Sequence, residues 1–202
     1  MQPILFFWIA FLVLLALMIF LDRKFQMLRD NSVALPKPYS YARVQLAWWT
    51  LVVLSCLIAI LLARNAMPTL DSSTLILLGM SAGTTVVARL TDISDRNNSG
   101  TDLVSQDFNG ENFLLDILSD KNGVSIHRLQ SVLINIIFGV WFIVQVLRHL
   151  TGVNPCLPGD LDCGKHPLDF IIPVISTNNL ILLGLSSGTY VALKTMENKT
   201  GG

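Results

Sequence analysis

Residues 68 to 92 read PTLDSSTLILLGMSAGTTVVARLTD, and residues 173 to 197 read PVISTNNLILLGLSSGTYVALKTME. Both segments begin with proline and contain Leu-Ile-Leu-Leu-Gly-x-Ser-x-Gly-Thr in the same register. An apolar run that carries small residues four positions apart is typical of a membrane helix that packs closely against another helix. The sequence therefore predicts that the chain contains the same spanning helix twice.

The rest of the composition indicates a membrane protein. Of 202 residues, 52% are hydrophobic and 14% are charged, and the mean hydropathy is +0.58. The apolar residues form runs of about twenty, the length of a helix that crosses a bilayer, whereas soluble helices interleave a polar face. We expect an all-α, polytopic transmembrane bundle of five spanning helices, in the apolar runs 3–21, 43–64, 73–90, 128–150 and 170–192.

The charges between these runs predict the orientation. No Lys or Arg precedes the first run, and it lacks the shorter apolar core and the small-residue cleavage site of a signal peptide, so we expect it to remain as a helix. Arg23, Lys24, Arg29 and Lys37 follow it, and basic residues beside a span favour the cytoplasm. We therefore expect a protein of the bacterial inner membrane with its N-terminus outside and its C-terminus in the cytoplasm.

A second similarity lies before the duplicated stretch. Ser40-x-x-Arg43-x-Gln45 precedes one apolar run, and Ser125-x-x-Arg128-x-Gln130 precedes another. The repeating unit is thus a helical hairpin, and two hairpins that begin on the same side of a membrane are parallel repeats. The predicted units are a leading helix with a cytoplasmic loop (1–39), hairpin repeat 1 (40–92), a cytoplasmic linker with a short amphipathic helix (93–124), and hairpin repeat 2 with the tail (125–202).

The small and hydroxyl residues of the duplicated stretch are candidates either for helix packing within one monomer or for the lining of a pore. A nonhelical break at Gly-x-Ser-x-Gly that binds a ligand is a third alternative. A hydrolase is not expected, because the nucleophile elbow requires a strand before its serine. The candidate residues are Gly79, Ser81, Gly83, Thr84, Gly184, Ser186, Gly188 and Thr189.

The Arg-x-Gln pairs are candidates for interfacial anchors. Arg43, Gln45, Arg128 and Gln130 begin their runs, where long polar side chains snorkel toward headgroups. Alternatively, they bond to the C-terminal ends of the third and fifth spanning helices. The centres of the runs contain no ionisable side chain except cysteine, which disfavours a proton-coupled carrier. Asn135 is the most polar residue deep in a run, and we expect it to form an interhelical hydrogen bond.

Two of the three cysteines share one polar loop. Cys156 and Cys163 fall outside the membrane in this topology, where an oxidising compartment favours a disulfide. A metal site that combines these thiols with Asp160, Asp162 or His166 has loose ligand spacing. We therefore expect the disulfide, with no metal ion and no cofactor. The remaining Cys56 is expected to be a buried apolar side chain.

The order of these motifs resembles that of a family of uncharacterised bacterial inner-membrane proteins with duplicated helical hairpins. The resemblance covers about residues 40 to 197 and supports the predicted architecture, but it implies no activity. The residues that carry it are Arg43, Gln45, Trp49, Gly79, Ser81, Gly83, Thr84, Gly123, Ser125, His127, Arg128, Gln130, Gly184, Ser186, Ser187, Gly188, Thr189 and Tyr190.

These patterns favour a non-enzymatic membrane protein that self-associates into a channel or a pore-like assembly. The first alternative is a scaffold or sensor that recruits a protein partner through the cytoplasmic segment 91–127, and the second is a carrier of small solutes. The expected partners are membrane lipid and further copies of the chain. Because the net charge is zero and no basic cluster stands out, nucleic acid is not expected.

Overall fold

The computed structural model describes residues 3–30, 36–65, 67–68, 70, 72–99, 112–120, 123–151 and 172–197, without the side chains of 91–99, 120, 190–191 and 193–197. The described chain is predominantly helical, as predicted. Its elements are α1 (Pro3–Phe25), α2 (Tyr41–Arg64), α3 (Ser72–Ser99), α4 (Phe113–Leu118), β1 (Ser119–Asp120), β2 (Gly123–Val124), α5 (Ile126–Leu150) and α6 (Thr177–Glu197).

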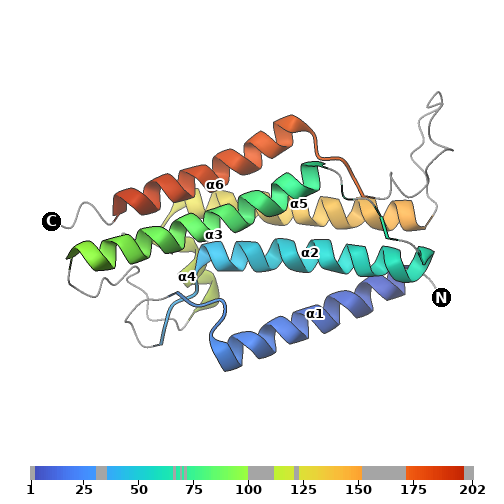
Figure 1. The fold of residues 1–202 in the computed structure, drawn as a ribbon, viewed down its shortest axis with the longest axis horizontal. Helices are drawn as coiled ribbons and strands as arrows, with labels where there is room; N and C mark the ends of the chain where they lie inside the picture. Colours follow the sequence, from blue (N-terminus) through green and yellow to red (C-terminus); the bar gives the residue numbers. More distant parts are fainter. Residues whose placement is uncertain are drawn as a thin grey trace.

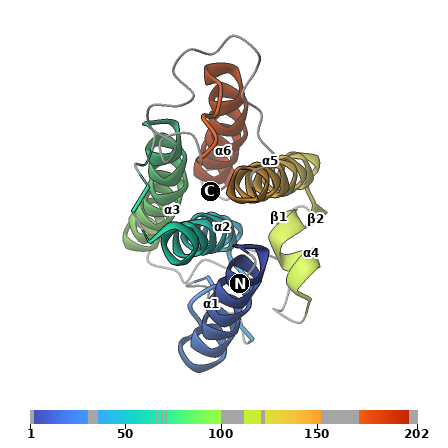
Figure 2. The same ribbon diagram turned by 90° about the vertical axis from the view of Figure 1, so that its right-hand side faces the viewer.

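The five long helices form one elongated bundle. Seen end-on, α2, α3, α6 and α5 surround a common centre, and α1 packs on the outer side of α2 (Figure 2). Helices α2 and α5 run in one direction, whereas α1, α3 and α6 run in the opposite one (Figure 1). As a result, α1 begins at one end of the bundle and α6 ends at the other.

Four of these helices are long and apolar enough to cross a membrane: α1, α2, residues 72–90 of α3, and α5. Helix α6 is not among them, and its sequence includes Thr177, Asn178 and Asn179 at the start and Lys194 and Glu197 near the end, which lower its mean hydropathy. The chain thus has the helices of a membrane protein. The count of five spans remains a prediction.

The bundle has a narrow core and an apolar outer surface. Phe7, Trp49, Val52, Ile60 and Phe142 are almost completely buried where α1, α2 and α5 meet. By contrast, many leucine, isoleucine and valine side chains of α1, α3 and α5 point outward. Such a surface costs free energy in water but fits the acyl chains of a bilayer.

The duplicated stretch differs at its edges from the expectation. Helix α3 continues to Ser99, into the region predicted to be a linker. Helix α6 starts only at Thr177, and an extended segment with buried Ile172 and Ile175 precedes it. Pro173 disfavours a helical conformation of Ile172 and has no amide hydrogen to donate, while the N–H of Ile175 donates to Ser73 Oγ at 3.0 Å.

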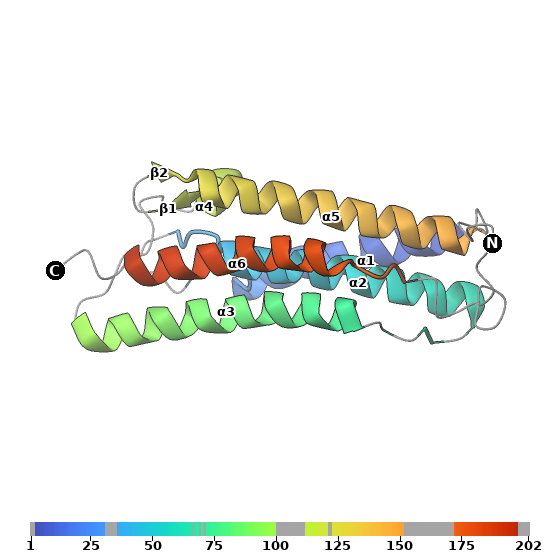
Figure 3. The same cartoon turned by 90° about the horizontal axis from the view of Figure 1, so that it is seen from above.

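Short elements close one end of the bundle, beside the starts of α2 and α5 (Figure 3). Arg29 and Tyr39 form a β-bridge, which folds the segment before α2 back on itself. The strands β1 and β2 pair antiparallel between α4 and α5. Gly123 adopts a φ of 103° there, a conformation that side chains with a Cβ rarely tolerate.

Candidate functional site

Asn135 lies at the place where α2, α5 and α6 meet. Its Oδ1 accepts hydrogen bonds from Trp49 Nε1 at 2.7 Å and from Gln45 Nε2 at 3.3 Å. Its Nδ2 donates to the backbone oxygen of Ser131 at 2.8 Å and to Tyr41 Oη at 3.4 Å. Only 4% of Asn135 is exposed. The interhelical hydrogen bond expected for this residue is confirmed, and it is one of several.

The backbone of Asn135 takes part as well. Its carbonyl oxygen accepts a hydrogen bond from Trp48 Nε1 at 3.1 Å. This indole can approach α5 because Gly139, one turn later, leaves room for it. An ideal Cβ at Gly139 would stand only 2.5 Å from Cζ2 of Trp48. Gly139 is therefore a point of close approach in the bundle, and it lies outside the duplicated stretch.

Helix α6 joins this arrangement through two serines. Gln45 Nε2 donates to Ser187 Oγ at 3.1 Å. The hydroxyls of Ser131 and Ser186 share a hydrogen bond, and Ser131 Oγ also donates to the carbonyl oxygen of Ser186 at 3.2 Å. We call the whole group the Asn135 cluster; it comprises Tyr41, Gln45, Trp48, Trp49, Ser131, Asn135, Ser186 and Ser187.

One atom of the Asn135 cluster has no partner among the described residues. The indole N–H of Trp49 identifies Asn135 Oδ1 as an acceptor, so Gln45 must present its amide nitrogen there. Its oxygen Oε1 is then left buried without a donor. Every member of the cluster is an amide, an indole, a phenol or a hydroxyl. The cluster therefore supplies interhelical hydrogen bonds that fix three helices, and such groups are neutral at physiological pH.

Three of the four predicted hydroxyls of the duplicated stretch bond to their own helices. Ser81 Oγ donates to Leu77 O at 3.1 Å and Thr84 Oγ1 to Met80 O at 2.8 Å, and both residues are buried. Thr189 is exposed, and its hydroxyl donates to Leu185 O at 2.8 Å. Such bonds satisfy a hydroxyl in apolar surroundings. Ser186 alone among the predicted hydroxyls reaches another helix.

The predicted glycines lie mostly on the outside of the bundle. At Gly79, Gly83 and Gly188, an added Cβ would meet no atom of the described chain within 4 Å, apart from neighbouring residues and its own helix backbone. At Gly184 it would stand 3.3 Å from the sulfur of Met80. Among the described residues, no contact within one monomer therefore requires a glycine at positions 79, 83 and 188.

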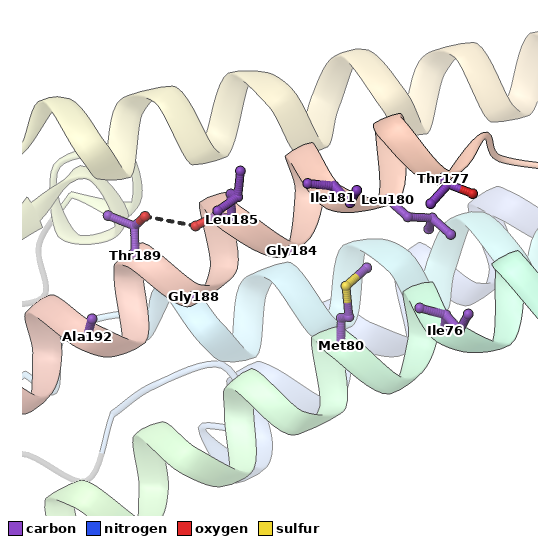
Figure 4. A pocket seen from close by; sticks show the side chains of 10 residues that line it. All are labelled: Ile76, Met80, Thr177, Leu180, Ile181, Gly184, Leu185, Gly188, Thr189 and Ala192. Carbon is purple, nitrogen blue, oxygen red and sulfur yellow. Dashed lines mark hydrogen bonds between the residues drawn. The ribbon is translucent and has the colours of Figure 1, made fainter.

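Two of these glycines line an open groove along α6 and α3. Figure 4 shows Met80 of α3 pointing toward α6 beside Gly184. The groove has a volume of about 730 Å³ and an almost entirely apolar lining. Its lining residues are Ile76, Met80, Thr177, Leu180, Ile181, Gly184, Leu185, Gly188, Thr189 and Ala192.

The prediction that all four residues of the Arg-x-Gln pairs are interfacial anchors is wrong for two of them. Gln45 and Arg128 are buried, with 6% and 5% exposure, so neither is an interfacial anchor that snorkels into water. Residues two apart on a helix point about 200° away from each other, so one member of each pair faces inward. Arg43 Nη1 donates to the carbonyl oxygen of Arg29, and Arg128 Nη1 to that of Ser119. Gln130 alone is well exposed.

The predicted disulfide of Cys156 and Cys163 lies outside the described residues. Cys56 is a free, buried cysteine in α2, in agreement with its expected apolar role. Among the described residues, no group of three or more His, Cys, Asp or Glu side chains is placed to hold a metal ion.

Outside the spanning helices, one buried carboxylate connects α4 with the segment that precedes α2. Asp116 of α4 is 1% exposed, and its Oδ2 accepts the N–H of Tyr39 at 3.1 Å. Burial raises the pKa of Asp116, while the Tyr39 N–H and the charge of Arg29 partly oppose this shift. Asp116 Oδ1 and the nearby Ser119 Oγ have no partner among the described residues.

Comparison with protein-family models, with curated proteins and with solved structures found no match to this chain. The resemblance to a family of inner-membrane proteins therefore remains a prediction.

Proposed function

We propose that this chain is a non-enzymatic integral membrane protein of five spanning helices that self-associates into a channel or a pore-like assembly. The opposite directions of successive long helices support an odd number of crossings, with α6 as the fifth (Figure 1). The shared direction of α2 and α5 supports two parallel hairpin repeats. Arg23, Lys24 and Arg29 follow the end of α1 or form its last turn, which supports placing that end in the cytoplasm of a bacterial inner membrane.

The observation that carries the proposal is the exposed small-residue surface of α3 and α6. Gly79 and Gly83 are exposed on α3, and Gly188 and Thr189 are exposed beside the groove on α6. A membrane helix gains most from such a surface when a second helix packs onto it, because glycine lets two backbones approach. We call this surface the α3–α6 face and propose that another copy of the chain covers it.

The polar groups of the single bundle favour a pore between copies over a pore within one chain. The hydroxyls of Ser81 and Thr84 are buried and bonded to their own helices. The Asn135 cluster uses its hydrogen bonds to hold helices together. A water path therefore requires hydroxyls brought together from several copies, and Thr189 is an exposed candidate for this role.

The association is tested by changing the α3–α6 face. Purified protein is reconstituted in lipid nanodiscs or mild detergent, and the size of the particle is measured by light scattering. We expect an oligomer for the natural chain and a shift toward monomer for Gly83→Leu and for Gly188→Leu. The matched control is Ala16→Leu, at an exposed small residue of α1. A natural chain that stays monomeric at every protein-to-lipid ratio would overturn the proposal.

Conduction is tested separately in planar bilayers. We expect ion flux from the natural chain, less from Gly83→Leu, and an unchanged level from Ala16→Leu. An oligomer without flux under any applied voltage or membrane tension would refute the pore but leave the self-association intact.

The second candidate function is a scaffold or sensor that engages a protein partner through residues 91–127. It is favoured by the exposed apolar side chains at this end of the bundle, which include Leu114, at 65% exposure, and Ile126, at 78%. Deletion of residues 97–110 separates the two candidates. A pore still assembles and conducts after the deletion, whereas recruitment of a partner is lost.

A further inference from the structure

A second groove lies between α1 and α2, away from the α3–α6 face. It has a volume of about 380 Å³, and apolar side chains form most of its walls. Tyr39 and Phe113 close it at the end where α1 finishes. We call it the α1–α2 groove; its remaining lining residues are Leu15, Met18, Ile19, Asp22, Arg23, Leu28, Val44, Ala47, Trp48 and Leu51.

The walls of the α1–α2 groove are held in place by contacts outside it. Trp48 donates its indole hydrogen to Asn135 O and packs on Gly139. Asp116 accepts the N–H of Tyr39, whose ring stands edge to face with Phe113 at 5.0 Å between centroids. These contacts fix the groove before anything enters it, which lowers the cost of ordering a ligand there.

Exposed basic side chains stand at and beside the rim of the groove. Its acidic residue, Asp22, is buried, and its Oδ1 accepts the N–H of Leu28 at 2.9 Å. Arg23 and Lys24 are exposed, and Lys24 Nζ stands 5.3 Å from the centre of the Phe25 ring. The guanidinium of Arg29 stacks on the Tyr39 ring at 4.6 Å. The Arg29 guanidinium also bonds to Lys37 O and Tyr39 Oη, so an anionic group at this rim would meet chiefly the exposed side chains of Arg23 and Lys24.

The groove runs from this rim toward the middle of the proposed bilayer. On α1 it extends from Arg23 back to Leu15, eight residues or about 12 Å at the rise of a helix. The end of a spanning helix lies at headgroup depth, and the part before it lies among the acyl chains. Basic chemistry at the rim and an apolar channel below it match the two halves of one phospholipid molecule.

We propose that the α1–α2 groove binds an anionic glycerophospholipid, with one acyl chain along α1 and α2 and the phosphate at Arg23 and Lys24. The occupant is a lipid of the surrounding membrane, because the groove opens on the outer side of the bundle and has its charged rim at the end of a span. The proposal concerns a different surface from the α3–α6 face, so it does not depend on self-association.

Native mass spectrometry of the full chain tests the headgroup. Lipid-depleted protein in detergent is incubated with phosphatidylglycerol or with phosphatidylcholine of the same acyl chains, and the retained adducts are counted. Because one basic side chain near a membrane surface changes anionic lipid binding by about fivefold, we expect Arg23→Gln to reduce phosphatidylglycerol binding by about that factor. The matched control Arg64→Gln, at the opposite end of α2, is expected to bind as the natural chain does.

The acyl-chain half is tested by filling the groove. Val44 lines it, so Val44→Phe is expected to reduce adducts of both lipids severalfold. Val13→Phe makes the same change at an exposed residue of α1 that does not line the α1–α2 groove, and we expect normal binding. The proposal is overturned if both lipids bind equally to the natural chain, or if Arg23→Gln binds like Arg64→Gln. It is overturned as well if a folded Val44→Phe variant binds like Val13→Phe. If Val44→Phe does not fold, the arginine pair decides alone.

Discussion

The two hairpins begin with the same Arg-x-Gln letters and use them in opposite ways. In α2, Gln45 is buried in the Asn135 cluster and Arg43 lies nearer the surface. In α5, Arg128 is buried and Gln130 is exposed. The neighbours of the two helices differ, because α1 packs mainly against α2, whereas α4 contacts both helices and the Arg128 guanidinium of α5 donates to Ser119 O directly after α4. Equal sequences therefore present different faces to the interior.

The two hairpins also contribute different chemistry to their contact. The first supplies the donors of Gln45, Trp48 and Trp49, and the second supplies the acceptors of Asn135 and Ser187. One bond runs the other way, from Asn135 Nδ2 to Tyr41 Oη. Asn135 and Thr50 both follow their arginine by seven residues. Thr50 nevertheless donates only to Leu46 O of its own helix. The repeat thus provides two similar hairpins, and residues that differ between them join the two.

The largest expected effect comes from removing the acceptor at the centre of the Asn135 cluster. Asn135→Leu leaves the indole N–H of Trp49 buried without an acceptor and leaves Gln45 Nε2 with Ser187 Oγ alone, which costs about 3 kcal/mol of unfolding free energy. The measurement is equilibrium unfolding in mixed detergent micelles. The matched change at the corresponding position of α2, Thr50→Val, is expected to cost about 0.5 kcal/mol. Equal losses at the two positions would show that the hairpins are interchangeable.

The next effect contrasts a glycine outside the duplicated stretch with one inside it. Gly139→Ala pushes a Cβ into the Trp48 ring and breaks its bond to Asn135 O, and overpacking of this kind costs about 2 kcal/mol. Gly79→Ala meets open space and replaces glycine by a better helix former, so we expect a gain of up to about 1 kcal/mol. Both variants are unfolded in dilute detergent, where the monomer prevails. A larger loss of unfolding free energy for Gly79→Ala than for Gly139→Ala would contradict the close approach of Trp48 to Gly139.

The sequence was a good guide to the helices because apolar runs and prolines act locally. It also indicated Asn135, since an amide in the middle of a spanning run needs an interhelical partner. It could not identify Trp48, Ser131 or Gly139 as parts of the same site, because their roles depend on the rotation of α2 against α5. The glycines of the duplicated stretch were conspicuous, yet three of them face away from the described bundle. A repeated pattern thus indicated a similar helix but not which of its faces is buried.

A smaller effect is expected from the two glutamines of the Arg-x-Gln pairs. Gln45→Ala removes hydrogen bonds to Asn135 and Ser187, but it also removes the unpartnered oxygen of Gln45, so the net loss is about 1 kcal/mol. Gln130→Ala changes an exposed residue and should stay within about 0.5 kcal/mol of the natural chain. The same unfolding measurement serves for both. If Gln130→Ala were the more harmful change, the assignment of buried and exposed faces would be wrong.

The smallest effect concerns the connection from α4 to the segment before α2, through Asp116 and the N–H of Tyr39. Because burial raises the pKa of Asp116 above the value of about 3.9 in an unfolded chain, the folded state favours the protonated acid. This contribution to stability is full below pH of about 3.9 and is lost as the pH rises through the folded pKa.

Asp116→Asn keeps an acceptor for Tyr39 but cannot ionise, so it should remove this decline from the unfolding free energy measured against pH. Ser119→Ala, a neighbouring change without a charge, should retain the decline. If the pH profile of Asp116→Asn were unchanged, protonation of Asp116 would not contribute to the unfolding free energy. The carboxylate would then act there only as a hydrogen-bond acceptor.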